Sequence, residues 1–288
     1  MKGVLADQVV LLTGASRGIG RALAFSLCGA GATVAMLARD EATLIKLSRE
    51  ITKIGGKAIP FCGDVSQPKK VSSVVNRVQE KLGNIDILVN NSGIQPPIGA
   101  FAENDLDDWE YNFKVNLFGA VRLIHAVLPL MLARGRGKII NFSGGGATAP
   151  RPHFSAYAAA KAALVRFTET LAVELSPCNI QVNAVAPGAV NTDMLDEIIA
   201  AGEKAGDEYR QGLERRAKGG TPVEMVCELV LFLASQASGN LTGKLISAPH
   251  DPWRQWAGEA DELNACPLFT MRRIDPFTIK PLIKDLGE

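Results

Sequence analysis

Seven short apolar runs rich in β-branched residues recur along this chain, and a stretch that suits a helix separates each from the next. Such runs are typical of strands that are buried on both faces, as they are in a parallel sheet. Strands that alternate with helices along the chain predict a doubly wound α/β sheet with helices on both faces. The candidate strands are Val9–Thr13, Thr33–Leu37, Ala58–Cys62, Ile85–Asn90, Lys138–Phe142, Ile180–Ala186 and Lys244–Ser247.

Two regions stand outside this alternation. Residues 191–220 are polar, charged and contain glycines, so we interpret them as a mobile flap. Residues 248–288 contain two of the three tryptophans and five prolines, with little periodicity. A tail with these aromatic residues is expected to pack on the body or on a partner subunit. Because no internal repeat or low-complexity linker is present, the sequence predicts one domain over residues 1–247, followed by that tail.

The composition argues against several classes of function. The 288 residues are 47% hydrophobic and 21% charged, with a formal net charge of +1. This balance gives no electrostatic reason to expect nucleic acid or an anionic membrane as a partner. We expect no signal peptide at the start and no uncharged apolar run near the roughly 20 residues that span a bilayer. Five scattered cysteines and three histidines without ligand spacing favour a cytoplasmic protein with reduced thiols and no metal site.

A glycine-rich turn follows the first predicted strand and precedes the first helix-like segment. It reads Thr13-Gly14-Ala15-Ser16-Arg17-Gly18-Ile19-Gly20. Glycine permits positive φ angles and lets backbone amides approach a phosphate closely, and a helix N-terminus adds partial positive charge. The turn therefore predicts a site for the phosphates of a dinucleotide, with a purely structural strand-to-helix turn as the alternative.

The end of the second predicted strand bears on the choice of cofactor. Enzymes that use NAD usually place an Asp or Glu there for the adenosine ribose hydroxyls. This chain has Ala38 followed by Arg39. The forked donors of Arg39 and Arg17 suit a 2′-phosphate, so the sequence favours NADP(H) over NAD(H). A solvated Arg39 paired with Asp40 or Glu41 is the alternative.

Tyr157 and Lys161 are separated by three alanines. On a helix, residues four apart lie on one face. A tyrosine hydroxyl with its usual pKa of about 10 is a poor acid or base at neutral pH, but a neighbouring cation favours the phenolate and lowers that pKa. The spacing therefore suits an acid/base pair, although an ordinary helix face has the same pattern by chance.

Together with the glycine-rich turn, further motifs make the chain resemble the short-chain dehydrogenase/reductases in their single-domain form, over roughly residues 5–247. The resemblance implies a Rossmann-type sheet of seven strands and a nicotinamide cofactor at its carboxyl edge. The matching motifs are Thr13 to Gly20, Cys62-Gly63-Asp64-Val65, Asn90-Asn91-Ser92-Gly93, Lys114-Val115-Asn116, Tyr157 to Lys161, and Pro187-Gly188 followed by Thr192.

The resemblance also implies roles for individual residues. Tyr157 would be the acid/base, Lys161 would hold the nicotinamide ribose and lower the pKa of the tyrosine, and Asn116 would keep a water in a proton relay. Asn116 as a residue at a helix kink and Thr192 as an N-cap are the structural alternatives. The implied cofactor-binding residues are Gly14, Ser16, Arg17, Gly18, Ile19, Gly20, Arg39, Asp64, Val65, Asn91, Gly93, Tyr157, Lys161, Pro187, Gly188, Val190 and Thr192.

The chain departs from the family at one catalytic position, because Gly144 stands where the family has a serine, thirteen residues before the tyrosine. Ser143 is one residue early and should point away from the substrate unless the strand end bulges. Losing one such donor typically costs on the order of 10²–10³ in rate. Three explanations are open: Ser143, Thr148 or Ser155 replaces the hydroxyl; a polar substrate supplies its own hydrogen bonds, with help from His153; or the site is slow, different in chemistry, or inactive.

The function that the resemblance implies is an NADP(H)-dependent oxidoreductase that interconverts a carbonyl and a secondary alcohol on a small-molecule substrate. The alternatives are an epimerase or dehydratase that retains its cofactor, and an NADPH-binding protein with weak catalysis. A homodimer or homotetramer is suggested by the family and by the apolar helix face of Ala163, Leu164, Phe167 and Leu171, which core packing explains equally well.

The tail departs from the family as well. Where many members have an acidic residue and paired glycines, this chain continues from Ser247 into Ala248-Pro249-His250-Asp251-Pro252-Trp253. We expect His250, Trp253 or Trp256 either to cover the substrate pocket or to bury the edge of the sheet.

Overall fold

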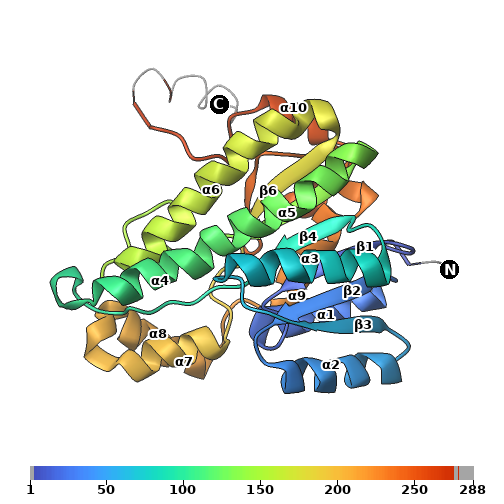
Figure 1. The fold of residues 1–288 in the computed structure, drawn as a ribbon. Helices are drawn as coiled ribbons and strands as arrows, with labels where there is room; N and C mark the ends of the chain where they lie inside the picture. The colour runs from blue at the N-terminus through green and yellow to red at the C-terminus, as the bar shows by residue number, and fades with distance from the viewer. Residues whose placement is uncertain (1–2, 276–277, 279–288) are drawn as a thin grey trace.

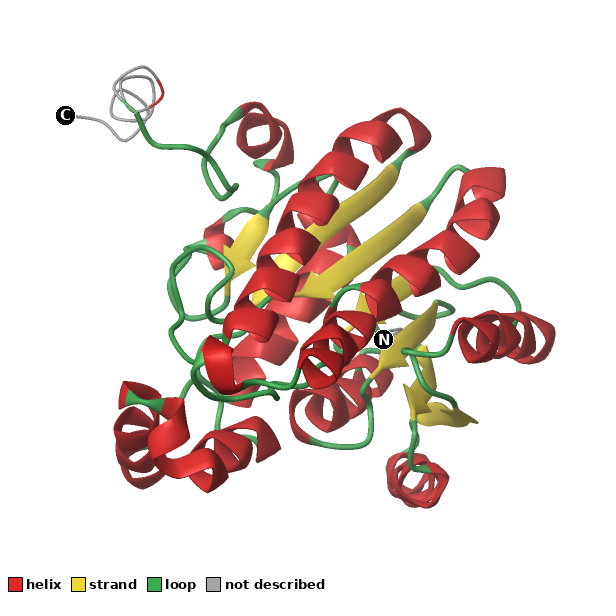
Figure 2. Cartoon of the chain, turned by 60° about the vertical axis from the view of Figure 1, so that its left-hand side comes forward, coloured by secondary structure: helices red, strands yellow, loops and turns green. Residues whose placement is uncertain are grey.

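Seven strands form one parallel sheet in the order β3-β2-β1-β4-β5-β6-β7, in a computed structural model that describes residues 3–275 and 278 (Figure 1). Helices cover both faces of the sheet (Figure 2). The predicted fold class is therefore confirmed. The strands are β1 (Val9–Thr13), β2 (Thr33–Ala38), β3 (Lys57–Cys62), β4 (Ile87–Asn90), β5 (Gly137–Phe142), β6 (Ile180–Ala186) and β7 (Leu245–Ser247).

Each observed strand lies within two residues of its predicted bounds. The largest difference is at β4, which begins two residues later than predicted. Asp86 lies just before this strand, and its carboxylate accepts hydrogen bonds from the Val9 amide at 2.9 Å and from Arg134 Nη1 at 2.6 Å. These two bonds fix Asp86 through its side chain, and the regular strand β4 begins after it, at Ile87.

Helices connect the strands and divide the core into two layers. One apolar cluster lies between the sheet and the helices α1 and α9, and a second lies between the sheet and α3, α5 and α6. The helices are α1 (Gly18–Gly29), α2 (Glu41–Lys53), α3 (Pro68–Leu82), α4 (Leu106–Asn116), α5 (Phe118–Arg134), α6 (Ser155–Leu175), α7 (Asp193–Ala201), α8 (Asp207–Lys218), α9 (Val223–Ala234) and α10 (Ala260–Ala265).

The strand order changes direction between β1 and β4. In doubly wound sheets, the connections on either side of such a point leave a crevice at the carboxyl ends of the strands, where ligands bind. The glycine-rich turn after β1 and the motif after β4 both open into this crevice. The topology therefore predicts where the site must lie.

The helices α4 and α5 follow each other with a break at Leu117. Within residues 3–275, the run Leu106–Arg134 is long and apolar enough to cross a membrane by length and composition alone. Its α5 half packs on α3 and against β4 and β5, and it contributes Leu123, Val127 and Met131 to the second core cluster. Core helices of soluble proteins pass the same test, so we interpret this run as part of the core.

The segment 191–220 is mostly helical. It contains α7, the short 3₁₀ helix η3 (Gly202–Ala205) and α8, which lie together at one end of the molecule (Figure 1). The two helices pack on each other more than on the sheet.

The tail packs on the body of its own chain up to about Met271. Trp253 and Trp256 are 3% and 4% exposed and belong to the core cluster that includes α9. Beyond them, the Leu245 amide of β7 donates to the Phe269 carbonyl at 2.7 Å, and Lys244 Nζ donates to the Cys266 carbonyl at 2.6 Å. The two tryptophans therefore do not cover the substrate pocket; they help to bury the end of the sheet.

Candidate active site

The glycine-rich turn is shaped for a phosphate. Gly14 and Gly18 have φ angles of +64° and +53°, which disfavour any residue with a side chain. A Cβ at position 20 would overlap the Gly14 carbonyl oxygen, so that position also requires glycine. No side chain caps the first turn of α1, so its free amides and its partial positive charge face the crevice.

Asn91 fixes this turn against the end of β4. Its Nδ2 donates to the carbonyls of Thr13 at 3.0 Å and Gly14 at 3.2 Å. The Thr13 hydroxyl in turn accepts from the amides of Asn91 and Ser92 at 3.0 and 2.9 Å. This network sets the two sides of the crevice at a fixed spacing, so Asn91 supports the turn that lines the cleft.

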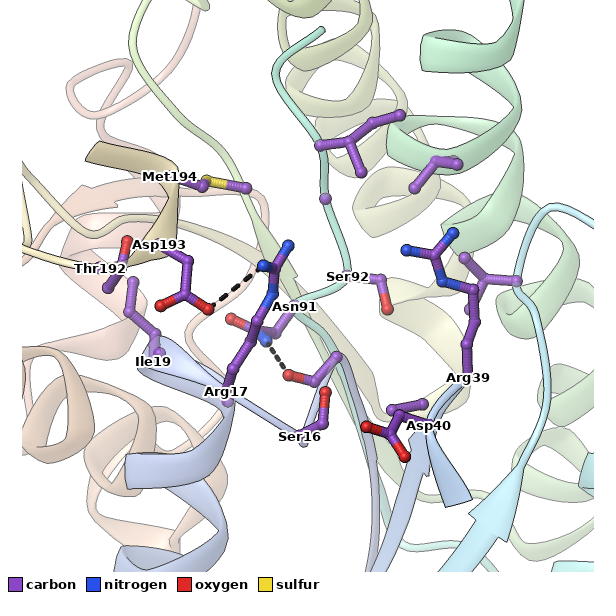
Figure 3. A pocket seen from close by; sticks show the side chains of 18 of the residues that line it. Ser16, Arg17, Ile19, Arg39, Asp40, Asn91, Ser92, Thr192, Asp193 and Met194 are labelled. Carbon is purple, nitrogen blue, oxygen red and sulfur yellow. Dashed lines mark hydrogen bonds and ion pairs between the residues drawn. The ribbon is translucent and has the colours of Figure 1, made fainter. Parts of the chain in front are cut away.

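The crevice holds a cavity of about 340 Å³, which we call the cofactor cleft (Figure 3). It brings together most of the residues predicted to bind the cofactor. Those that line it are Gly14, Ser16, Arg17, Gly18, Ile19, Gly20, Arg39, Asp64, Val65, Asn91, Gly93 and Thr192. The lining residues that sequence reasoning missed are Ala38, Asp40, Thr43, Gly63, Ser92, Ile94, Val115, Asp193 and Met194.

Most of the missed residues adjoin a predicted position in sequence, so the motifs carry the signal for them. The exceptions are Thr43, in the first turn of α2, and Met194, in the first turn of α7, because neither adjoins a predicted residue. Asp193 and Met194 both belong to α7 and lie beside the cleft (Figure 3). Thr192 occupies the N-cap position of α7, although its side chain makes no capping hydrogen bond.

The two arginines predicted to clamp a 2′-phosphate do not point at a common place, because each contacts a different helix. Arg39 is exposed, and its Nη1 lies 3.5 Å from the Tyr111 hydroxyl. Arg17 instead turns to α7, where its guanidinium pairs with Asp193 at 3.2 Å (Figure 3). It also pairs with Glu197 at 3.4 Å. Asp40 caps α2 by accepting from the Thr43 amide at 3.0 Å and so is not committed to Arg39.

Five of the predicted cofactor-binding residues are not among those that line the cleft: Tyr157, Lys161, Pro187, Gly188 and Val190. Gly188 has a φ of +74°, and a Cβ there would lie 2.8 Å from Pro249. Val190 packs partly buried against the first core cluster. Pro187, Gly188 and Val190 belong to the turn after β6 that leads the chain into α7.

Tyr157 and Lys161 lie on α6 and are 5% and 2% exposed. Lys161 Nζ donates to the Phe142 carbonyl at 2.8 Å and lies 5.5 Å from the centre of the Tyr157 ring. Burial lowers the pKa of Lys161 to about 8. Burial also raises the pKa of Tyr157, with the cation of Arg151 as the largest opposing influence. The expected lowering of the tyrosine pKa is therefore not found in this buried arrangement.

Asn116 lies close to both the cleft and Lys161. It is 1% exposed, and its Nδ2 donates to the Ile94 carbonyl at 2.8 Å and to Asn112 Oδ1 at 2.7 Å. A Cβ at Gly93 would lie 2.9 Å from Asn116 Oδ1 and 3.6 Å from Lys161 Nζ. Gly93 thus joins the cofactor cleft to Asn116 and Lys161. Because α4 ends at Asn116, its position at a helix break is also observed.

Gly144 faces Tyr157 directly. A Cβ at this position would overlap Tyr157 Oη and lie 2.9 Å from Cζ. The tyrosine hydroxyl therefore occupies the space that a side chain at position 144 would take. The Ser143 amide extends the ladder by donating to the Val185 carbonyl at 2.8 Å, and alternation along an extended strand then directs its side chain to the opposite face. Ser143 Oγ is buried and has no hydrogen-bond partner among the described residues.

Other hydroxyls near Gly144 have different surroundings. Ser155 Oγ accepts a hydrogen bond from Trp109 Nε1 at 3.1 Å, and Thr148 is exposed. His153 has a φ of +68° and packs against Gly206, where a Cβ would lie 2.7 Å from the imidazole Cδ2. No hydrogen bond in the described residues links any of these three side chains to Tyr157.

The segment with α7 and α8 covers Tyr157. Together with Phe154, the tyrosine forms a small apolar cluster with Ile198 of α7 and Ala205 of η3. Arg151, in the loop before α6, pairs with Glu208 of α8 at 2.5 Å. The cofactor cleft is open, whereas the substrate side of the site is closed.

Comparisons with known proteins agree with this geometry. The family model for the short chain dehydrogenases matches residues 8–202. The 3-oxoacyl-[acyl-carrier-protein] reductase FabG of Thermotoga maritima is 36% identical over 244 residues, which cover 84% of this chain and 96% of that protein.

Solved structures show the same arrangement. A gluconate 5-dehydrogenase from Burkholderia cenocepacia, in complex with NADP and tartrate, superposes with a TM-score of 0.76 at 32% identity, covering 84% of this chain and 94% of that one. An NAD⁺-bound xylitol dehydrogenase gives a TM-score of 0.78 at 26% identity, covering 84% and 98%. Members of this structural group thus bind either nicotinamide cofactor.

Proposed function

Because the chain belongs to the short-chain dehydrogenase/reductase family, we propose that it is an NADP(H)-dependent oxidoreductase that interconverts a carbonyl and a secondary alcohol, with Tyr157 as the acid/base. The observation that carries the proposal is Gly93, which joins the glycine-lined cleft to Lys161 and Asn116. One continuous site therefore holds a phosphate-binding turn at one end and a tyrosine–lysine pair at the other.

The residues of the cleft fit a dinucleotide. Gly14, Gly18 and Gly20 let the backbone turn tightly beside the cleft, and the N-terminus of α1 has no side-chain cap, so its amides can bind a phosphate. Asp64 and Val65 would flank the adenine, and Arg39 would pair with a 2′-phosphate. The preference for NADP(H) rests on Arg39 together with the absence of a carboxylate at Ala38.

When bound, the nicotinamide would supply or accept the hydride. Lys161 would hold the nicotinamide ribose and, as a cation, favour the deprotonated form of Tyr157. Tyr157 would give a proton to the substrate oxygen in reduction or take one in oxidation. Asn116 is buried beside Gly93 and would hold the water of a proton relay behind Lys161. The segment α7–α8 would exclude water from this reaction.

The test is NADPH and NADH oxidation by the purified protein against a broad panel of aldehydes and ketones, run beside Tyr157→Phe. We expect turnover that prefers NADPH and falls by about 10²–10⁴ in the variant, since general acid catalysis contributes that much. NADPH affinity should hardly change, because Tyr157 lies outside the cleft lining. Normal turnover by the Phe variant would refute the mechanism.

A second candidate is an NADPH-binding protein with weak catalysis. The closed cover over Tyr157 and the glycine at position 144 favour it. It predicts tight NADPH binding without turnover on any carbonyl of the panel. An epimerase or dehydratase would instead convert its substrate with catalytic amounts of cofactor, which product analysis detects.

We also propose a homo-oligomer and a cytoplasmic location. The helix face first considered for an interface does not support the oligomer, because Leu164 and Leu171 are buried in the chain's own core. Exposed apolar side chains do occur on the same layer, at Phe118, Leu132 and Val173. Light scattering coupled to size exclusion gives the oligomeric state. All five cysteines are free thiols, which suits a reducing compartment.

A further inference from the structure

Arg151 lies in the loop between β5 and α6, and its side chain is only 12% exposed. Its Nε and Nη2 donate to the two carboxylate oxygens of Glu208 at 2.5 and 2.6 Å. Two parallel hydrogen bonds of this kind are the geometry in which arginine recognises a carboxylate most specifically. The loop that precedes the catalytic helix thus holds a carboxylate site, and the chain itself fills it from α8.

The position of Arg151 does not depend on Glu208 alone. Its guanidinium carbon lies 4.0 Å from the centre of the Phe154 ring and 5.1 Å from that of Tyr157. A Cβ at Gly145 would lie 3.6 Å from Arg151 Nε, and one at Gly146 would lie 3.0 Å from Arg151 Cβ. The arginine is therefore held by the two rings and by close packing on Gly146, and it lies beside Tyr157 as a preorganised cation.

Glu208, in contrast, belongs to the segment that covers the site. Gly206 and Gly219 bound α8 with φ angles of +59° and +94°, and a Cβ at Gly219 would meet nothing within 4 Å. A substrate reaches Tyr157 only if this cover moves, and such a movement separates Glu208 from Arg151. The movement removes the two charge-assisted hydrogen bonds between Glu208 and Arg151. A carboxylate on the substrate would replace these two bonds.

We propose that Arg151 anchors the substrate and that Glu208 occupies the place of a substrate carboxylate while the site is closed. The inference rests on the proposed function and adds a substrate class to it: carbonyl compounds, or the matching alcohols, with a carboxylate close to the reacting carbon. It extends one of the three explanations for Gly144, in which a polar substrate supplies the hydrogen bonds that the missing serine would make. Arg151 is then the residue that recognises this substrate. His153, proposed for that task from sequence, packs on Gly206 instead.

Binding of a small dicarboxylate tests the anchor without turnover. Isothermal titration of the NADPH-loaded protein should show that malonate binds and that malonamide, its neutral analogue, does not. Arg151→Met should weaken malonate binding by about 10- to 100-fold, the value of a hydrogen-bonded charge pair, and Arg151→Lys should retain part of the affinity. The matched control is Arg254→Met, because Arg254 also pairs with a glutamate (Glu228, 2.6 Å) and lies 4.2 Å from the Trp253 ring centre.

Removing the internal competitor tests the role of Glu208. Glu208→Gln should strengthen malonate binding by about 3- to 10-fold, since an amide competes for Arg151 less well than a carboxylate does. Glu214→Gln is the matched control on α8, because Glu214 is exposed and pairs only with Lys218 at 3.5 Å among the described residues. Unchanged malonate affinity in Glu208→Gln would show that the pair is only a structural latch and would overturn the inference.

Turnover with acid and ester pairs separates this inference from the proposed function. Pyruvate and acetoacetate should be reduced with lower KM than their methyl esters, and Arg151→Met should raise KM for the acids only. Equal effects on acids and esters, or equal malonate binding by Arg151→Met and the unmodified protein, would overturn the inference. Tyr157-dependent reduction of neutral ketones alone would refute the anchor but support the oxidoreductase. Arg151-dependent malonate binding without any turnover would support the anchor and refute the oxidoreductase.

Discussion

The cofactor cleft and the proposed catalytic pair, Tyr157 and Lys161, are joined through Gly93, yet the cleft is open to solvent while the two side chains are buried. The cleft is shaped mainly by backbone: glycines, helix N-termini and the amide of Asn91 set its outline. The catalytic pair is shaped by side chains that come from α6, α7 and α8. The two halves should therefore respond differently to substitution, and each prediction below separates them by measuring nucleotide binding and turnover independently.

The largest effect is expected at Lys161. Lys161→Met removes the cation beside Tyr157, so turnover should fall by about 10²–10⁴. NADPH affinity should fall only about 10-fold, because the cleft keeps its phosphate-binding turn and loses one charged hydrogen bond. Steady-state kinetics and fluorescence titration measure the two quantities, with Lys138→Met as the control for loss of a partly buried lysine. If binding and turnover disappeared together, the two halves would not be separable.

A smaller effect is expected at Gly144, where a side chain would displace the Tyr157 hydroxyl. Gly144→Ala and Gly144→Ser should both lower kcat by about 10²-fold, since a misplacement near 1 Å has that cost. NADPH affinity should stay unchanged in both variants. If the Ser variant were faster than the unmodified protein, the site would lack a hydrogen-bond donor that the serine restores, and the role given to Arg151 would be wrong.

In the cofactor cleft, substitutions are expected to change the preference for NADPH over NADH. Arg39→Ala should weaken NADPH binding by about 10- to 100-fold and leave NADH binding unchanged, because a charged hydrogen bond contributes this much. Arg17→Ala should weaken it less, since the Arg17 guanidinium already pairs with Asp193 and Glu197. Titration with both nucleotides compares the variants. Equal weakening of NADPH and NADH by Arg39→Ala would indicate that Arg39 does not recognise the 2′-phosphate.

The contrast between a cleft shaped by backbone and a catalytic pair shaped by side chains also explains which features the sequence predicts well. Strands such as β1 and β6 are found at their predicted bounds, because an apolar run between turn residues is a local signal. The cleft is predictable for a related reason. Positions such as Gly14 and Gly20 require glycine whatever packs around them, so a short motif is enough to identify them.

The catalytic side depends on contacts that no local pattern carries. Arg151 and Glu208 lie 57 residues apart in sequence and meet only because α8 folds over the loop before α6. The raised pKa of Tyr157 follows from the same packing, since burial outweighs the nearby cation. The spacing of Tyr157 and Lys161 predicts an acid/base pair, but it does not predict how thoroughly the pair is buried.

The smallest predicted effect concerns lysine burial itself. Burial lowers the pKa of Lys138 to about 8, as it does for Lys161, although Lys138 lies at the start of β5 and donates to Ser238 Oγ at 2.9 Å. A lysine whose pKa is lower in the folded state binds fewer protons there, so the free energy of unfolding rises with pH from about 8 toward the unfolded value. Each lysine should contribute about 1 kcal/mol between pH 7 and 9.

Comparing variants with the unmodified protein isolates this contribution. Burial raises the thiol pKa of Cys28 and Cys227 to about 11, which gives a pH dependence of opposite sign, but these thiols are the same in every variant. Denaturant unfolding at pH 7 and pH 9 should show that Lys138→Met and Lys161→Met each lack about 1 kcal/mol of the rise. Only Lys161→Met should lose turnover. This result would show that burial lowers the pKa of both Lys138 and Lys161 to near 8. Lys161 would then differ from Lys138 in its catalytic role because it lies beside Tyr157. If Lys138→Met kept the full rise, burial would not be the cause of its lowered pKa.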